Sequence, residues 1–101
     1  DVVGVFTNQD LQNLYNQLIE TGNVSDVEAL KVGAAIEEID ILDLEANLLT
    51  VDNQDITFVY NNLTKGSENH LRAFVKNLSM RGVTYSPVYL NIETYNAIIN
   101  N

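Results

Sequence analysis

The sequence predicts an all-α protein, and three observations lead to that fold class. Apolar residues recur at intervals of three and four along most of the chain, as they do on one face of an α-helix. Residue pairs with capping-box spacing stand in front of these periodic segments. The 101 residues include only one proline and five glycines, so little interrupts a helix. This length supports one hydrophobic core, and we expect a single domain over residues 1–101.

A first, shorter helix is expected near the N-terminus. Thr7 and Asp10 have the spacing of a capping box, and Gly22 ends the periodic segment that follows. Its apolar residues share one face and are Leu11, Leu14, Tyr15, Leu18 and Ile19.

A long second helix is expected from Asp26 to about Leu49. Ser25 and Glu28 form its capping box, and Gly33 is its one potential breaker. One apolar face consists of Leu30, Gly33, Ala34, Ile41, Leu44 and Leu48, and a neighbouring face consists of Val32, Ile36 and Ile39. Such a helix is buried over about half its circumference, as in a helical bundle. We expect Gly33 to allow a neighbouring helix to approach closely.

A third helix is expected from about Gln54 to Met80, ended by Gly82. Its inward-facing residues are predicted to be Ile56, Val59, Tyr60, Leu63, Leu71, Phe74, Val75 and Leu78. Its solvated side is predicted to carry Lys65, Asn69, Arg72 and Lys76. The connection around Asp52 and Asn53 is short, so the two long helices should be antiparallel neighbours.

A short final helix follows an irregular stretch at Ser86-Pro87. Asn91 is expected to cap it. Its apolar face consists of Ile92, Tyr95, Ile98 and Ile99.

Composition excludes several classes of function. Fourteen acidic and five basic residues give a formal net charge of -9, which repels phosphate backbones, so we expect no nucleic-acid partner. The chain has no cysteine, so any metal must be bound by oxygen and imidazole ligands. No apolar run reaches the roughly 18–20 residues that span a bilayer, so no membrane span is expected.

Two further features bear on the origin of the chain. Sequons at Asn23, Asn62 and Asn77 slightly favour an exported location over a cytoplasmic one. The sequence begins at Asp1 and not at methionine, which favours a processed polypeptide with an upstream portion.

Two polar residues occupy positions where the helical period calls for apolar ones. Glu37 lies on the second helix between Ala34 and Ile41, where a carboxylate needs a cation, a hydrogen-bond partner or a shifted pKa. His70, the only histidine, follows Leu63 by seven residues on the third helix. A carboxylate and an imidazole from antiparallel helices are typical of di-iron and di-manganese carboxylate proteins.

The ligand pattern is incomplete. Glu38 and Asp40 are neighbours of Glu37 that could substitute for missing ligands, and Asp40, three residues after Glu37, is a further candidate ligand on the same side. Three residues before His70 stands Ser67 and not glutamate, while Glu68 points about 200° away from His70. Any remaining carboxylates would have to come from helices outside this chain. From spacing alone, a lone histidine on an apolar face is more often a hydrogen-bonded core residue than a ligand.

Three segments resemble an uncharacterised prokaryotic family of ferritin-like proteins, which is catalogued as a domain of unknown function. They are Gly4-Val5-Phe6-Thr7-Asn8, the run from Ala29 to Ile41 that contains Ile36-Glu37-Glu38, and Asn69-His70-Leu71-Arg72-Ala73-Phe74. The tail around Tyr85-Ser86-Pro87 and Tyr89-Leu90 is similar as well. The resemblance covers essentially the whole chain.

The resemblance implies half of a ferritin-like four-helix bundle. Two long antiparallel helices would be flanked by the shorter N-terminal helix and the short C-terminal one, and another chain or a second copy would supply the missing helices. Glu37 would then be the carboxylate of the third bundle helix and His70 the imidazole of the fourth. The implied cofactor is iron or manganese, with redox chemistry on oxygen or peroxide.

Two hypotheses about function follow. The first is a ferritin-like metal-binding subunit that uses Glu37, Asp40 and His70. The second is a structural module of an oligomer or filament, in which the metal site is degenerate and Glu37 and His70 form a buried hydrogen-bonded pair. In both hypotheses the inner faces of two long helices need an obligate partner.

Overall fold

The computed structural model describes residues 9, 12–13, 16, 26–50 and 53–101. Within these residues the chain forms three helices, α2 (Asp26–Leu48), α3 (Gln54–Met80) and α4 (Ile92–Ile99), and no strand. The predicted all-α class is therefore confirmed. The predicted first helix, Thr7 to Gly22, lies mostly outside the described residues. Those of its residues that are described have helical conformation.

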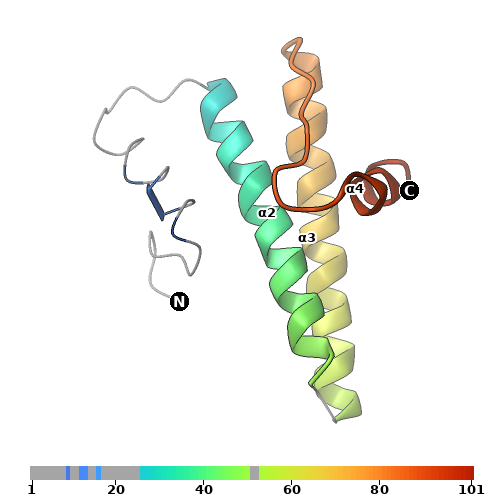
Figure 1. The fold of residues 1–101 in the computed structure, drawn as a ribbon. Coiled ribbons are helices and arrows are strands. Elements are labelled where there is room, and N and C mark those ends of the chain that lie inside the picture. The colour runs from blue at the N-terminus through green and yellow to red at the C-terminus, as the bar shows by residue number, and fades with distance from the viewer. Residues whose placement is uncertain (1–8, 10–11, 14–15, 17–25, 51–52) are drawn as a thin grey trace.

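Helices α2 and α3 lie side by side and run in opposite directions, as the short connection predicts (Figure 1). Asn53 begins α3, because its side-chain oxygen accepts hydrogen bonds from the backbone N–H groups of Asp55 and Ile56 at 2.8 and 3.4 Å. This N-cap satisfies two of the backbone donors that a helix start leaves without intrahelical partners. From the sequence, Asn53 was predicted only to belong to the connection between the two long helices.

A left-handed glycine ends α3. Gly82 has φ of 77°, which is strained for residues with a Cβ atom. The N–H of Gly82 donates to the carbonyl of Ser79 and the N–H of Val83 donates to that of Leu78, both at 2.9 Å. These two bonds form a Schellman motif, which satisfies helix-end carbonyls and turns the chain back toward α2.

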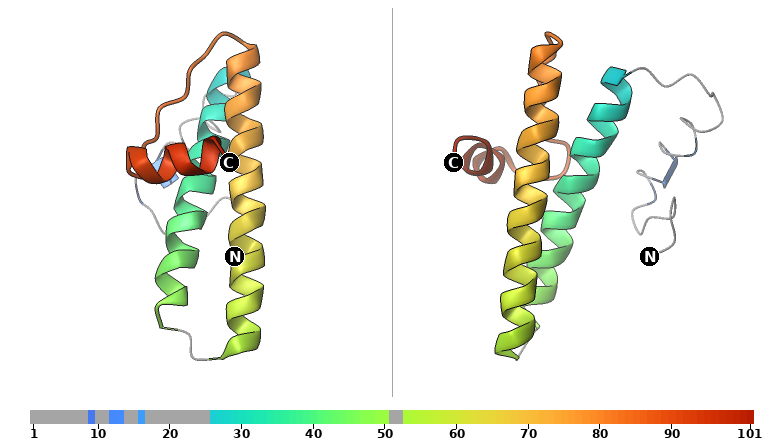
Figure 2. Two further views of the ribbon diagram at one scale, coloured as in Figure 1. Left: turned by 90° about the vertical axis from the view of Figure 1, so that its right-hand side faces the viewer. Right: turned by 180° about the vertical axis from the view of Figure 1, so that it is seen from behind.

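The segment from Val83 to Asn91, here called the C-terminal strap, leads back along the helix pair and places α4 across it (Figure 2). Asn91 caps α4 by accepting from the N–H of Thr94 at 2.8 Å, as predicted. One guanidinium nitrogen of Arg72 donates to the carbonyl of Ile98 at 2.9 Å. Arg72 was predicted to lie on the solvated side of this helix, and that prediction is wrong for Arg72 because α4 packs against it and leaves it partly buried.

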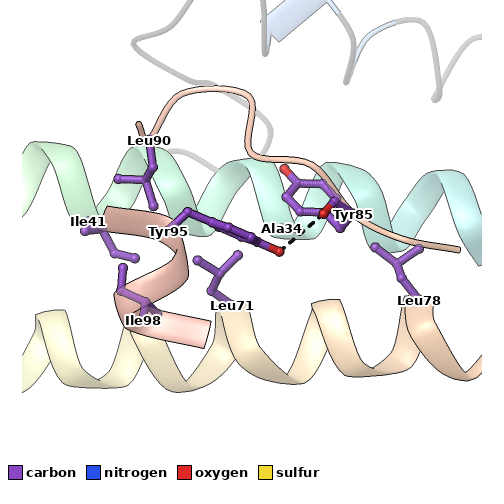
Figure 3. Close-up of a cluster of buried hydrophobic side chains, with 8 residues drawn as sticks. All are labelled: Ala34, Ile41, Leu71, Leu78, Tyr85, Leu90, Tyr95 and Ile98. Carbon is purple, nitrogen blue, oxygen red and sulfur yellow. Dashed lines mark hydrogen bonds between the residues drawn. The ribbon is translucent and has the colours of Figure 1, made fainter. Parts of the chain in front are cut away.

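The core lies where α2, α3, the strap and α4 meet (Figure 3). Its buried members are Ala34, Ile41, Leu71, Leu78, Tyr85, Leu90, Tyr95 and Ile98. Gly33 faces the ring of Phe74 so closely that a Cβ atom on Gly33 would lie 2.6 Å from two ring carbons. The predicted close approach of a neighbouring helix at Gly33 is thus confirmed.

The first half of α3 differs from the prediction. Ile56, Val59 and Leu63 were expected to face inward, yet they are 46%, 51% and 51% exposed. The strap and α4 cover the helix pair only beside the second half of α3, so nothing within the described ranges covers these three residues. No described helix is both long enough and apolar enough to cross a membrane.

Candidate functional site

An open groove of about 640 Å³ separates part of α2 from the facing part of α3. Three carboxylates line it from α2, namely Glu37, Asp40 and Asp43. Ser67 and His70 line it from α3. The three carboxylates are three residues apart, which places them on neighbouring turns of one helix side. The groove thus brings together the three residues that the sequence singled out as candidate ligands.

Glu37 and His70 are in direct contact across the groove. The Oε2 atom of Glu37 lies 3.4 Å from Nδ1 of His70. The Glu37 side chain is 13% exposed, whereas the His70 side chain is 68% exposed. His70 was predicted to project from the core stripe, and it lies instead at the open side of the groove. The reason is that the buried stripe of α3 passes through Leu71 and Leu78, one residue out of phase with His70.

Two of the groove carboxyl groups, Glu37 and Asp40, have pKa values above their ordinary values. Burial is the largest cause that raises the pKa of Glu37, followed by the negative charge of Asp40. The imidazole of His70 and a hydrogen bond from Ser67 act in the opposite direction on Glu37. Burial also raises the pKa of Asp40, with Asp43 adding to the effect. These carboxylates are short of positive charge, which is a favourable setting for a cation.

The described residues that line the groove do not form a complete metal site. Among the described residues, no three histidine or acidic side chains converge closely enough to hold an ion. Two ligand atoms that share one first-row ion, each about 2.1 Å from it, lie about 3.0–3.4 Å apart. The separation of 3.4 Å between Glu37 and His70 is compatible with a shared ion as well as with a direct ion pair. Asp40 is close enough to Glu37 for each carboxyl group to affect the pKa of the other, but within the described residues it does not complete a cluster of three ligands.

A second carboxylate on α2, Glu38, which the sequence offered only as a possible substitute for Glu37, is fully buried. Its Oε2 accepts from the hydroxyl of Tyr85 at 2.5 Å. Its Oε1 accepts from the backbone N–H groups of Tyr89 and Leu90 at 2.9 and 2.8 Å, and both oxygens share the N–H of Val88 at 3.1 Å. These four donors hold the C-terminal strap against α2.

The burial of Glu38 also affects the tyrosines around it. Burial, and then the hydrogen bond to Glu38, raise the pKa of Tyr85 well above its usual range. Burial and the Glu38 charge raise the pKa of Tyr95 as well. Both tyrosines therefore stay neutral donors to well above neutral pH, and the hydroxyl of Tyr95 reaches the carbonyl of Tyr85 at 3.4 Å (Figure 3).

A signal for Glu38 was present in the sequence. Glu38 lies four residues after Ala34 and three before Ile41, and both of these are fully buried. Glu37 lies three after and four before the same two residues, so spacing alone ranks the two glutamates equally. Which of them is buried depends on where the strap lies, and the strap is a long-range feature.

Comparison with known proteins relates this chain to one family of protein domains. The sequence profile of the uncharacterized protein domain DUF2202 matches residues 1–101. The uncharacterized protein MJ0754 of Methanocaldococcus jannaschii is 52% identical over 101 residues. The match covers all of this chain and 55% of that protein, so the chain spans about half the length of the relative.

A solved structure shares the fold. It is the crystal structure of hypothetical protein MJ0754 from Methanococcus jannaschii, with a TM-score of 0.80 and 51% sequence identity. The superposition covers 99% of this chain and 57% of that one.

Proposed function

The chain belongs to the DUF2202 family of uncharacterized protein domains, and we propose that it is a ferritin-like subunit that binds iron or manganese through Glu37, Asp40 and His70. One observation carries the proposal. The carboxylate of Glu37 and the imidazole of His70 come from two facing helices and lie 3.4 Å apart in an open groove. This arrangement resembles the way in which bundle proteins build metal sites from side chains on facing helices.

The chemistry of the donors supports these metals. Two carboxylates and one imidazole suit iron and manganese, and the chain has no thiolate that would favour softer ions. Glu37 and Asp40 together would balance the charge of one divalent ion, which would compensate the two negative charges whose burial is the largest cause that raises the pKa of each group. Iron or manganese, when bound, supplies redox chemistry with oxygen or peroxide. Glu37, Asp40 and His70 would hold the ion, and the open groove would let a small oxidant approach.

The bundle would be completed by further helices. Ile56, Val59 and Leu63 form an exposed apolar stripe on α3, here called the open stripe, which continues toward His70. A stripe of this kind beside a half-formed polar site is typical of a surface that another element covers. The chain spans about 55% of the length of its relative, and the missing helices would come from another chain or a second copy.

The test measures bound metal. The protein is purified aerobically without chelator, its iron and manganese are measured by elemental analysis, and Mn²⁺ affinity is measured by calorimetry. Glu37→Gln and His70→Ala should each lower the affinity at least tenfold, as the loss of one of few ligands does. Glu45→Gln, which removes an exposed carboxylate elsewhere on α2, is the matched control and should leave the affinity unchanged. Equal affinity in all four proteins, or no metal in any, contradicts the proposal.

A second candidate is a structural module whose metal site is degenerate. It is favoured by Ser67, which stands where a Glu-x-x-His unit would carry its glutamate. It is also favoured by the contact between Glu37 and His70, which needs no ion. In this case Mn²⁺ does not bind, whereas His70→Ala still weakens association between subunits. The metal measurement and a light-scattering measurement on the same variants separate the two candidates.

A further inference from the structure

We propose that a cavity between α3, the C-terminal strap and α4, here called the α4 cavity, binds a free fatty acid. Lys76 and Arg72 would hold its carboxylate, and apolar residues of α3, the strap and α4 would cover its aliphatic chain. The α4 cavity shares no lining residue with the groove and faces another side of α3. The inference is therefore independent of the proposed function.

Two adjoining hollows form the α4 cavity. The larger hollow, of about 400 Å³, lies between α3, the strap and α4. The smaller hollow, of about 330 Å³, lies between α3 and α4. Val75, Ser79 and Ile99 line both, so the two hollows meet along one side of α3. Each volume lies within the range of about 300–1,000 Å³ that is typical of small-molecule sites.

The larger hollow is mainly apolar. Its apolar lining residues are Val75, Val83, Pro87, Ile92, Tyr95 and Ile99, and no charged residue lines it among those that the structure describes. Ile92 is 56% exposed, although it belongs to the apolar face that the sequence predicts for α4. An aliphatic chain in this hollow would remove such apolar surface from water, which is favourable.

The smaller hollow has the opposite charge to most of the molecule. Arg72 and Lys76 line it, and no aspartate or glutamate lines either hollow within the described ranges. The chain has fourteen acidic and only five basic residues, and the groove on the other side of α3 is lined by three carboxylates. Two basic residues without an acidic neighbour in the lining make an anionic group the complementary ligand here.

The two basic residues can hold a carboxylate together. Arg72 is fixed by two hydrogen bonds, because its guanidinium donates to the carbonyl of Ile98 and to Oδ1 of Asn69. A guanidinium has more N–H groups than these two bonds use. Lys76 is exposed, lies one turn further along α3 and forms no ion pair with another described residue. Charge-assisted bonds of this kind are among the strongest that a carboxylate accepts.

The arrangement of the two hollows selects the class of ligand. Both basic residues line the smaller hollow, whereas the larger one is apolar and has no charged residue in its described lining. A ligand that occupies both hollows has one anionic end and one aliphatic end. An unbranched fatty acid has this form.

The experiment titrates the protein with dissolved decanoate, octanoate and decanol by calorimetry and locates the ligand by NMR chemical shifts. Decanoate should bind about tenfold more tightly than octanoate, because two more methylene groups are buried. It should also bind about tenfold more tightly than decanol, which lacks the charge. The largest shifts of backbone amides should occur at Val75, Ser79 and Ile99, which line both hollows.

Three variants test the two ends of the α4 cavity. Lys76→Glu should weaken decanoate binding about tenfold or more and leave decanol binding unchanged. Lys65→Glu makes the same charge change at an exposed site on the same side of α3 and outside the cavity, so this matched control should leave both affinities unchanged. Ser79→Phe should weaken both ligands, because Ser79 is exposed and lines both hollows. If thermal unfolding shows that Ser79→Phe is not folded, Ile92→Asn takes its place.

Several results would overturn the inference. They are no binding of decanoate, equal affinity for decanoate and decanol, equal loss of decanoate binding in Lys76→Glu and Lys65→Glu, and shifts confined to residues of the groove. Binding to phosphatidylglycerol vesicles without binding of dissolved decanoate also overturns it, because the partner is then a lipid surface. None of these measurements reports Mn²⁺ affinity, so the proposed function is tested separately.

Discussion

At the scale of single residues, two adjacent glutamates on α2 have opposite environments. Glu37 faces the groove, where one imidazole and a neighbouring carboxylate are its main electrostatic partners. Glu38 is fully buried and accepts hydrogen bonds from one hydroxyl and three backbone N–H groups. Burial of a carboxylate is tolerated where donors surround it. Glu38 therefore serves structure, and Glu37 is the one left with capacity for a ligand.

Glu38→Ala should destabilise the protein by about 3–5 kcal/mol, because it leaves buried N–H groups and the Tyr85 hydroxyl without an acceptor. Urea denaturation measures the loss. Hydrogen exchange should speed up at the amides of Val88, Tyr89 and Leu90, which bond to Glu38. Glu45→Ala, at an exposed site on the same helix, is the control and should change stability by less than about 0.5 kcal/mol. A loss below about 1 kcal/mol in Glu38→Ala contradicts this account.

Glu37→Gln should slightly stabilise the metal-free protein at neutral pH, by about 0.5 kcal/mol, since it removes a half-buried charge. The pKa of Glu37 is raised in the folded state above its ordinary value of 4.5. Its stabilising contribution is therefore full below 4.5 and is lost as pH rises through the higher folded-state pKa. Melting temperatures measured from neutral pH down to about 4.5 should rise less in the variant than in the unaltered protein. A variant that is less stable than the unaltered protein at neutral pH would show that the Glu37–His70 pair is a structural bond.

At this scale the sequence predicted the contact between Glu37 and His70, but it missed the hydrogen bonds that surround Glu38. Glu37 and His70 share a groove because helical period and antiparallel pairing are enough to bring them together. The Glu38 cluster depends on residues 47 to 52 positions away, and no local pattern encodes that pairing. The role of Glu37, Asp40 and His70 as metal ligands stays a prediction.

At the scale of elements, the helix bounds were predictable because caps and breakers are local. Asn91 and Gly82 act at the positions expected from the sequence, and α3 has the expected range Gln54–Met80. The strap was only an irregular stretch in the sequence. Its path depends on tertiary hydrogen bonds to Glu38, so its shape could not be predicted from the spacing of apolar residues.

Gly33→Ala should destabilise the helix pair by about 1–2 kcal/mol, although alanine favours a helix over glycine by about 1 kcal/mol. The new Cβ atom would lie 2.6 Å from the ring of Phe74, which has to move. Phe74→Leu in the same chain should recover part of the loss in a double-mutant cycle measured by thermal unfolding.

Gly66→Ala is the matched control, because a Cβ atom there meets nothing within 4 Å. It should be neutral or stabilising by up to about 1 kcal/mol, which is the helix propensity alone. If the two alanine variants have equal stability, the contact between Gly33 and Phe74 does not limit the approach of the helices.

At the scale of the whole molecule, an acidic chain carries an uncovered apolar stripe. The net charge of -9 opposes self-association, whereas the open stripe on α3 favours it. The sequence predicted that Ile56, Val59 and Leu63 face inward, and in the described residues they face no partner. The mismatch arises because the helical period shows that a face of α3 is apolar, but it does not show which chain covers that face.

Leu63→Glu should reduce association of the protein. Light scattering at micromolar concentration should give a mass above the 11.3 kDa of one chain for the unaltered protein and a lower mass for the variant. Phe58→Glu changes an exposed apolar residue on another side of α3 and is the control, which should leave the mass unchanged. A monomeric unaltered protein, or equal masses in both variants, contradicts a role of the open stripe in assembly.

The bond between the strap and Glu38 also bears on how the chain folds. Helices α2 and α3 are joined by a short connection, so their pairing closes a small loop at low entropic cost. The strap pairs with residues about fifty positions earlier, and we expect such long-range contacts to form late in folding. Changes at Tyr85 or Glu38 should therefore speed unfolding and leave the folding rate almost unchanged. The hydrogen bonds that hold the strap would then set how long a folded molecule lasts, and the helix pair would set how fast one forms.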